Sequence, residues 1–371
     1  MSPAIPIDRY RTIGILASQD AGRTTTTERI LAIAELSDAM ADPMADERAI
    51  TQTSGATSCD WHGHRLNLIE LPALGRPVDS AAMNAIDAVV VVVDAERGVT
   101  PEVDAALAQA ASRGLARLVF VNKLDRAGSD FEAIARSVAQ GLPLQLPIGA
   151  GAGLAGLVDV VGMIGLLWPA NADAAEHGVI PSEFQAAAAA AHQALATAVG
   201  GKDGAALGPA IREAVRAGTL VPVLCGSAFR NRGTRRLLDA IVDYLPAPSD
   251  VAHKAFAADG TEIEQQASDD ASFAGLAFRT VSEPTAGRMT FLRVYAGALA
   301  TGDRVFNPAS RRDERVGPMI RVRAKHSETV ETARAGDVVA LAGLEHTSSG
   351  DTLCDPSAPV ILGEFRPRSA A

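Results

Sequence analysis

A loop of small residues stands between an apolar run and a helical pattern near the start of the chain. Residues 13–16 are apolar and predict a buried strand, residues 17–22 form the loop, and residues 24–31 have the pattern of a helix. The amides of such a loop and of the first helical turn all point toward one anion, so the arrangement predicts a phosphate-binding loop. The P-loop pattern ends in Lys followed by Ser or Thr, whereas Arg23 and Thr24 follow the loop here. The loop is present, with arginine in place of its phosphate-binding lysine.

A second polar motif, Asn122-Lys123-Leu124-Asp125, directly follows residues 116–121, which are expected to form a buried strand. Ligands of open α/β sheets bind at the carboxyl ends of the strands, which is where this motif is expected to lie. The Asp125 carboxylate can accept two N–H groups from guanine, while adenine would leave this acceptor unpaired. Asn122 would support the loop, and the stem of Lys123 would pack along the plane of the base. The motif therefore favours a guanine nucleotide.

The sequence of residues 17–31 reads Ala-Ser-Gln-Asp-Ala-Gly-Arg-Thr-Thr-Thr-Thr-Glu-Arg-Ile-Leu. It resembles the first nucleotide motif of bacterial elongation factor G, which usually reads Ala-His-Val-Asp-Ala-Gly-Lys-Thr-Thr-Thr-Thr-Glu-Arg-Ile-Leu. Further matches follow in the family's order at residues 60–69, at 120–126 and at 222–229, and they continue from residue 273 nearly to the end. The resemblance covers most of the chain.

The resemblance implies a nucleotide site that holds GTP or GDP with Mg²⁺ as cofactor. The residues that match the family's nucleotide motifs are Asp20, Ala21, Gly22, Arg23, Thr24, Thr25, Asn122, Lys123, Asp125, Gly226, Ser227 and Ala228. The amides of Ser227 and Ala228 would contact the guanine oxygen. The expected metal ligands are Thr24, Thr51 and Glu70.

The part of the family pattern that carries catalysis is changed in this chain. The family's second switch reads Asp-Thr-Pro-Gly-His, and its histidine orients the attacking water. The matching residues here are Glu70-Leu71-Pro72-Ala73-Leu74, and no histidine occurs between Arg65 and Asp87. Leu74 can neither donate nor accept a hydrogen bond, and positioning is a large part of phosphoryl-transfer catalysis. We therefore expect no intact catalytic residue, slow or absent hydrolysis, and, because arginine is not interchangeable with lysine in a tight loop, weakened nucleotide binding.

The elements that position these motifs follow from the alternation of apolar and polar stretches. Residues 1–250 alternate strand-like and helix-like segments, as expected of an α/β P-loop GTPase domain with a mostly parallel sheet. Residues 86–94 are apolar on both faces, as a central parallel strand should be. Thr100 followed by Pro101 predicts a helix that begins with a threonine cap.

Two further divisions of the chain are expected. The resemblance implies a small inserted subdomain at residues 155–220, which includes an alanine-rich helical stretch at 184–199. The helix-breaking sequence Leu-Pro-Ala-Pro-Ser-Asp at 245–250 predicts the domain boundary. Beyond it, short alternating segments separated by turn signals predict an antiparallel β-barrel domain over residues 251–371.

Cysteine and histidine placement gives little sign of a further metal site. Cys59, Cys225 and Cys354 lie far apart and fit no metal spacing, so we expect buried thiols and a reducing, cytoplasmic location. His62 and His64 alternate on an expected hairpin and could be metal ligands. Packing or surface histidines are favoured, because no third ligand is in view.

Composition limits the partners. The 371 residues are 47% hydrophobic with a net charge of −10, and the apolar runs are too short to span a membrane, so we expect no membrane and no DNA partner. A local basic stretch at residues 304–325 could meet RNA or could be a solvated face.

We expect a monomeric, divergent relative of elongation factor G that binds guanine nucleotide. The family resemblance implies the ribosome, through its RNA and proteins, as partner. It ends after the expected barrel, so full translocase activity is not expected. Two alternatives stay open: a non-hydrolysing pseudo-GTPase that acts as a regulatory or decoy module, and an inert truncated paralogue.

Overall fold

The fold was determined from a computed structural model of the chain. The structure describes residues 5–38, 55–76, 80–169, 175–257, 259–283, 287–323 and 326–363. Thr51, one of the expected metal ligands, lies outside these ranges. Among the helices in the described ranges, none is long and apolar enough to cross a membrane.

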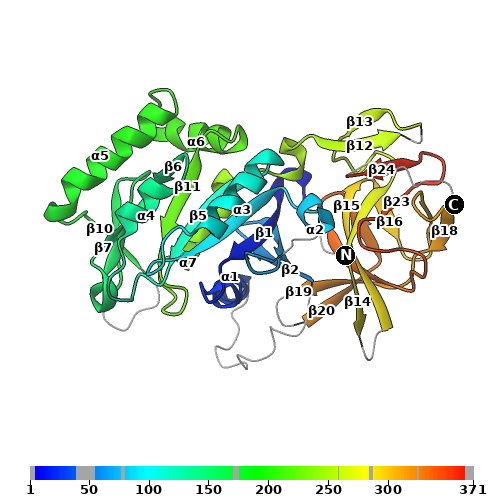
Figure 1. Cartoon of the computed structure of the whole chain (residues 1–371), viewed down its shortest axis with the longest axis horizontal. Helices are drawn as coiled ribbons and strands as arrows, with labels where there is room; N and C mark the ends of the chain where they lie inside the picture. The colour runs from blue at the N-terminus through cyan, green and yellow to red at the C-terminus, as the bar shows by residue number, and fades with distance from the viewer. Residues whose placement is uncertain are drawn as a thin grey trace.

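A mostly parallel sheet with helices on its faces occupies the first part of the chain (Figure 1). Its strands lie in the order β2-β3-β1-β4-β5-β11-β6, and only the β2–β3 pair is antiparallel. The strands are β1 (Tyr10–Ala17), β2 (Ala56–Trp61), β3 (His64–Glu70), β4 (Ala88–Asp94), β5 (Ala116–Asn122), β6 (Gly141–Pro143) and β11 (Val221–Cys225). The helices of this part are α1 (Arg23–Asp38), α2 (Ser80–Asn84), α3 (Pro101–Ser112), α4 (Phe131–Ser137) and α7 (Thr234–Tyr244).

The central strands are buried on both faces, which explains why their sequences are largely apolar. All residues of β1, β4 and β5 are buried, including the five consecutive valines of β4. A strand covered by helices on both faces cannot alternate apolar with polar residues without burying unpaired polar groups. The predicted parallel α/β sheet is confirmed.

A smaller antiparallel sheet and two helices extend from the β6 edge (Figure 1). The sheet contains β7 (Gln145–Ile148), β8 (Gly156–Asp159), β9 (Ile164–Leu167) and β10 (Glu176–Gly178), in the order β10-β9-β8-β7. The helices are α5 (Ser182–Ala198), which contains the alanine-rich stretch, and α6 (Leu207–Arg216). The assignment of residues 155–220 as an inserted subdomain stays a prediction.

The second part of the chain is built from antiparallel strands, as the turn spacing predicts. Its main sheet runs β18-β17-β23-β14-β15-β22-β19, and β19 meets β2 of the first part through the single pair Arg323 and Ser58. The strands are β12 (His253–Ala257), β13 (Glu262–Gln265), β14 (Ala274–Glu283), β15 (Gly287–Ala296), β16 (Ala298–Ala300), β17 (Arg304–Asn307), β18 (Arg312–Arg315), β19 (Met319–Arg323), β20 (His326–Val330), β21 (Thr332–Arg334), β22 (Val338–Ala342), β23 (Thr352–Cys354) and β24 (Val360–Leu362). The exact domain boundary at residue 250 stays a prediction.

A buried ion pair joins the two parts. One guanidinium nitrogen of Arg293, on β15, lies 2.8 Å from each carboxylate oxygen of Asp87, and neither side chain is exposed. Arg293 also donates to the Ala85 carbonyl at 3.1 Å, and the Tyr295 hydroxyl donates to the Asn84 carbonyl. The strand-rich part is thus attached to the segment between α2 and β4.

Candidate functional site

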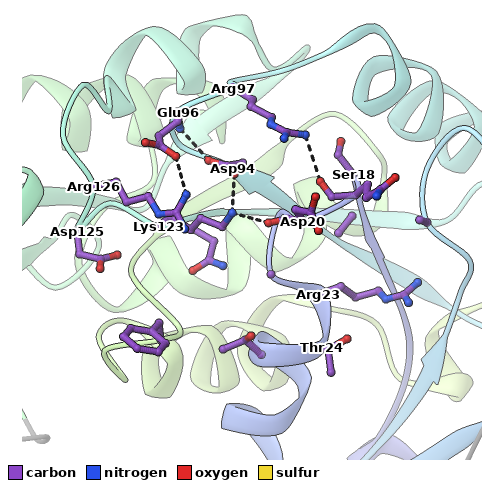
Figure 2. A pocket seen from close by; sticks show the side chains of 17 residues that line it. Ser18, Asp20, Arg23, Thr24, Asp94, Glu96, Arg97, Lys123, Asp125 and Arg126 are labelled. Atoms are coloured by element: carbon purple, nitrogen blue, oxygen red, sulfur yellow. Dashed lines mark hydrogen bonds and ion pairs between the residues drawn. The ribbon is translucent and has the colours of Figure 1, made fainter. Parts of the chain in front are cut away.

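A cavity of about 620 Å³ opens at the carboxyl ends of β1, β4 and β5. Figure 2 shows the side chains that converge on it from the loops after these strands and from the start of α1. The lining residues are Ala17, Ser18, Gln19, Asp20, Gly22, Arg23, Thr24, Thr25, Ala73, Asp94, Glu96, Arg97, Asn122, Lys123, Asp125, Arg126 and Phe229. The cavity lies where open α/β sheets bind their ligands.

The loop between β1 and α1 passes through backbone conformations that only a few residues tolerate. Gly22 has φ +96°, and a Cβ placed there would lie 2.4 Å from Nδ2 of Asn122. Asp20 has φ 64°, in the left-handed region that Asp and Asn enter more readily than most residues. Glycine is required at position 22 for both its conformation and the close approach of Asn122.

Asn122 connects three segments of the chain beneath the cavity floor. Its Nδ2 donates to the Ala21 carbonyl at 2.9 Å, and its Oδ1 accepts from the Ala228 amide at 2.9 Å. The amide of Leu124 donates to the Gly226 carbonyl at 3.1 Å. The phosphate loop, the end of β5 and the loop after β11 are therefore held in one arrangement by the side chain of Asn122 and its neighbours.

Lys123 lies against the phosphate loop. Its Nζ is 2.7 Å from Oδ2 of Asp94, at the end of β4, and it also donates to the Asp20 carbonyl (Figure 2). Burial alone would raise the pKa of Asp94, but the hydrogen bonds from Lys123 and from the Glu96 amide outweigh it and lower the pKa. Asp94 is ionised at neutral pH and holds Lys123 in position.

Asp125 presents a carboxylate at the end of the cavity opposite Arg23 (Figure 2). Oδ2 of Asp125 accepts from Nε of Arg230 at 3.1 Å, and the Asp125 side chain is 14% exposed. Partial burial opposes ionisation, but hydrogen bonds from Ser227 and Arg230 lower the pKa of Asp125 below the ordinary value. Phe229 also lines the cavity, and 76% of its surface is exposed.

Glu70 and Leu74 do not line the cavity as the family pattern implies. The Leu74 amide donates to the Ala17 carbonyl at 3.0 Å, while the Leu74 side chain packs against the hydrophobic core. Ala73 lines the cavity, and neither Leu74 nor Glu70 does. The Arg23 guanidinium donates to the Leu71 carbonyl.

The comparisons with known proteins agree with this geometry. Residues 8–247 match the family model described as the elongation factor Tu GTP binding domain, and residues 272–356 match elongation factor G domain 2. The chain belongs to the elongation factor G family of translation GTPases. It is 42% identical to "Elongation factor G 2" of Streptomyces coelicolor over a match that covers 96% of this chain and 57% of that protein.

A solved structure shows the same fold. A crystal structure of a protein from Thermus thermophilus matches with a TM-score of 0.77 and 26% sequence identity, over 94% of this chain and 54% of that one. The chain therefore spans little more than half the length of either protein.

Most of the site residues expected from the family pattern lie together. Those that line the cavity are Asp20, Gly22, Arg23, Thr24, Thr25, Asn122, Lys123 and Asp125. Those that lie behind the cavity wall are Ala21, Gly226, Ser227 and Ala228, all of which are buried. Their role in nucleotide binding stays a prediction.

Sequence reasoning missed several residues that line the cavity. Asp94 is the last residue of β4, and Glu96 and Arg97 follow it. Ser18, Gln19, Arg126 and Phe229 neighbour the predicted motifs. Asn122 was assigned to the site because ligands of open α/β sheets bind at the carboxyl ends of the strands. The same reasoning applied to β4 would have located Asp94. In the described ranges, no group of three His, Cys, Asp or Glu side chains is placed to hold a metal ion.

Proposed function

We propose that the cavity binds a guanine nucleotide and that Asp125 selects the base. The observation that carries this proposal is the position of the Asp125 carboxylate, low in pKa and in the cavity wall, three residues after the Asn122 side chain that fixes the phosphate loop. An ionised carboxylate accepts two adjacent N–H groups from guanine, and adenine cannot supply this pair because its ring N1 carries no hydrogen. A volume of about 620 Å³ is in the range of sites for small ligands and cofactors.

Mg²⁺ would be bound mainly by the nucleotide. Thr24 places a hydroxyl in the cavity wall, and Glu70 does not reach it. Because Mg²⁺ in nucleotide sites keeps several waters and takes most other ligands from phosphates, one threonine hydroxyl suits a metal that arrives on the nucleotide. When bound, the ion would neutralise phosphate charge.

Hydrolysis would be slow or absent. Leu74 packs against the core and has no group that could orient water, and Arg23 is engaged with the Leu71 carbonyl. These two features favour a second function, that of a module that binds the nucleotide without hydrolysing it. In either case we propose a cytoplasmic protein that acts in translation and associates with the ribosome, as family membership suggests.

Nucleotide binding is tested by titration with a fluorescent GDP in Mg²⁺, with ATP and xanthosine diphosphate as competitors. The wild-type protein should bind GDP and ignore both competitors. Asp125→Asn replaces the acceptor with an amide that can donate to the 2-oxo group of xanthine, so this variant should lose GDP and gain xanthosine diphosphate. Failure of the wild-type protein to bind GDP at hundreds of micromolar would refute the proposal.

Hydrolysis and ribosome association need separate measurements. Single-turnover release of phosphate from GTP should be slow in the wild-type protein and should rise in Arg23→Lys/Leu74→His. A rapid wild-type rate would exclude the non-hydrolysing module. Cosedimentation with ribosomes, with and without a slowly hydrolysed GTP analogue, tests the partner; absence of cosedimentation in both conditions would remove the ribosome from the proposal.

A further inference from the structure

Two guanidinium groups in the cavity wall are not neutralised by a carboxylate. Of the four cationic side chains that line the cavity, Lys123 lies 2.7 Å from Asp94, and Arg126 lies 2.7 Å from Glu96. Arg23 and Arg97 form no ion pair with any residue in the described part of the chain. Their charge is therefore available to a ligand.

Both guanidinium groups donate to backbone carbonyls, one within the phosphate loop and one just after β3. Nη1 of Arg97 donates to the Gln19 carbonyl at 3.3 Å, near the start of the loop. Arg23, at the end of the loop, donates to the Leu71 carbonyl. A guanidinium carries five N–H donors, so one carbonyl contact leaves most of them free for an anion.

The two arginines lie on opposite sides of the phosphate loop. In the view of Figure 2, Arg97 lies above the loop residues Ser18 and Asp20 and Arg23 lies below them, and Asp125 is at the far end of the cavity from Arg23. The Ser18 hydroxyl lines the cavity and has no hydrogen-bond partner among the described residues. A nucleotide whose base is at Asp125 would extend its phosphates along the loop, and the last phosphate would come closest to the two arginines.

We propose that Arg97 and Arg23 clamp the terminal phosphate of a bound nucleoside triphosphate. This inference rests on the proposed nucleotide function of the same cavity. A planar guanidinium can make two parallel hydrogen bonds to phosphate oxygens, which an ammonium cannot. Arg23 contributes from the first turn of α1, and Arg97 contributes from the turn between β4 and α3.

The charge of the surrounding residues explains why a second arginine is needed. Asp20, Asp94 and Glu96 place three carboxylates in the cavity wall. Lys123 and Arg126 offset two of them, and the carboxylate of Asp20 has no such partner among the described residues. A nearby carboxylate repels a phosphate strongly where solvent screening is weak, so the charge of Asp20 favours two guanidinium groups at the phosphate over one.

The test compares the affinities of Arg97→Ala, Arg97→Lys and the wild-type protein for three ligands in Mg²⁺. A slowly hydrolysed GTP analogue, GDP and guanosine are titrated by calorimetry. Arg97→Ala should lower the affinity for the GTP analogue by about tenfold, because a charge-assisted hydrogen bond to a phosphate is lost. The affinity for GDP should fall by much less, and the affinity for guanosine should not change. Arg97→Lys should recover part of the loss. Arg136→Ala is the matched control, since Arg136 lies on α4 with 72% of its side chain exposed and does not line the cavity.

The outcomes separate this inference from the function on which it rests. If Arg97→Ala binds the GTP analogue as tightly as the wild-type protein does, or weakens all three ligands equally, the clamp is refuted and guanine binding stands. If the wild-type protein binds none of the three ligands, both proposals fail. A loss confined to the triphosphate supports the clamp.

Discussion

At the scale of single residues, the phosphate loop depends on one glycine. Gly22 combines φ +96° with a Cβ position only 2.4 Å from Nδ2 of Asn122. Any side chain at this position would strain the backbone and also displace the amide that fixes the cavity floor.

Gly22→Ala should therefore abolish nucleotide binding and lower the free energy of unfolding by about 2–4 kcal/mol, through strain and loss of the Asn122 hydrogen bonds. Urea unfolding and nucleotide titration check this. Gly114→Ala is the matched control. Gly114 has φ +70° with nothing within 4 Å of the added Cβ, so this substitution should cost only the free energy of holding alanine in a left-handed backbone conformation. Equal losses in the two variants would contradict the close-contact argument.

The residues of the site could be predicted to different degrees. Asn122 and Asp125 were located because their motif follows an expected buried strand, and the structure places Asn122 at the end of β5 and Asp125 three residues later. The engagement of Arg23 with the Leu71 carbonyl could not be predicted, because it depends on the path of a segment 48 residues away. Arg97 was missed because a charged residue in a turn is most often a solvated one.

At the scale of elements, helix caps show where sequence reasoning is incomplete. Thr100 occupies the N-cap position of α3 as predicted, but its side chain makes no capping hydrogen bond. Asp130 caps α4, and its carboxylate accepts from the Ala133 amide at 2.9 Å. Position along the chain fixes which residue begins a helix, but the side-chain rotamer decides whether the residue caps it.

Asp130→Ala should destabilise the protein by about 1 kcal/mol, because an amide of the first turn loses its acceptor. Thr100→Ala should cost clearly less, since no capping bond is lost. Thermal unfolding of the two variants under the same conditions gives the comparison. A larger loss in Thr100→Ala would show that its hydroxyl caps α3 in solution.

At the scale of the whole molecule, the attachment of the two parts was outside the reach of sequence reasoning. The order of parallel and antiparallel regions follows from local patterns, and it was predicted. The Asp87–Arg293 pair joins residues 206 positions apart, and nothing in either local sequence marks the partner. Such a contact depends on how two finished sheets pack.

Asp87→Asn and Arg293→Met should each destabilise the protein by about 3–5 kcal/mol, because each leaves a buried group without its partner. The double variant Asp87→Asn/Arg293→Met should lose less than the sum of the single losses, since no uncompensated charge remains. Denaturant unfolding of all four proteins completes the cycle. Additive losses would mean that the pair is not coupled.

His253 makes this junction sensitive to acid. Its Nε2 lies 3.5 Å from both Asp87 and Arg293, and burial, followed by the charge of Arg293, holds the pKa of His253 well below its usual value. The unfolded chain therefore binds this proton more readily than the folded protein does. The stability contribution is full above about pH 6.5 and falls as the pH decreases, by at most about 1.4 kcal/mol per pH unit.

His253→Gln should remove this part of the acid sensitivity. Unfolding free energies at pH 7.5 and pH 5.5 should differ less in the variant than in the wild-type protein. Other histidines contribute equally to both proteins, so the difference between them isolates His253. An identical pH dependence would show that His253 is accessible to protons in the folded state.

The anchoring role of Asn122 affects how the evolution of this site can be interpreted. Its side chain holds the phosphate loop and the loop after β11 through bonds at 2.9 Å, so selection for a stable fold alone would retain it. Asp125 is bound by Ser227 and by Arg230, whose side chain is half exposed, and the core would survive its loss. In related proteins that no longer bind nucleotides, Asn122 would be conserved while Asp125 would be substituted. The aspartate, and not the asparagine, is therefore the residue whose retention across relatives would record continued use of the ligand.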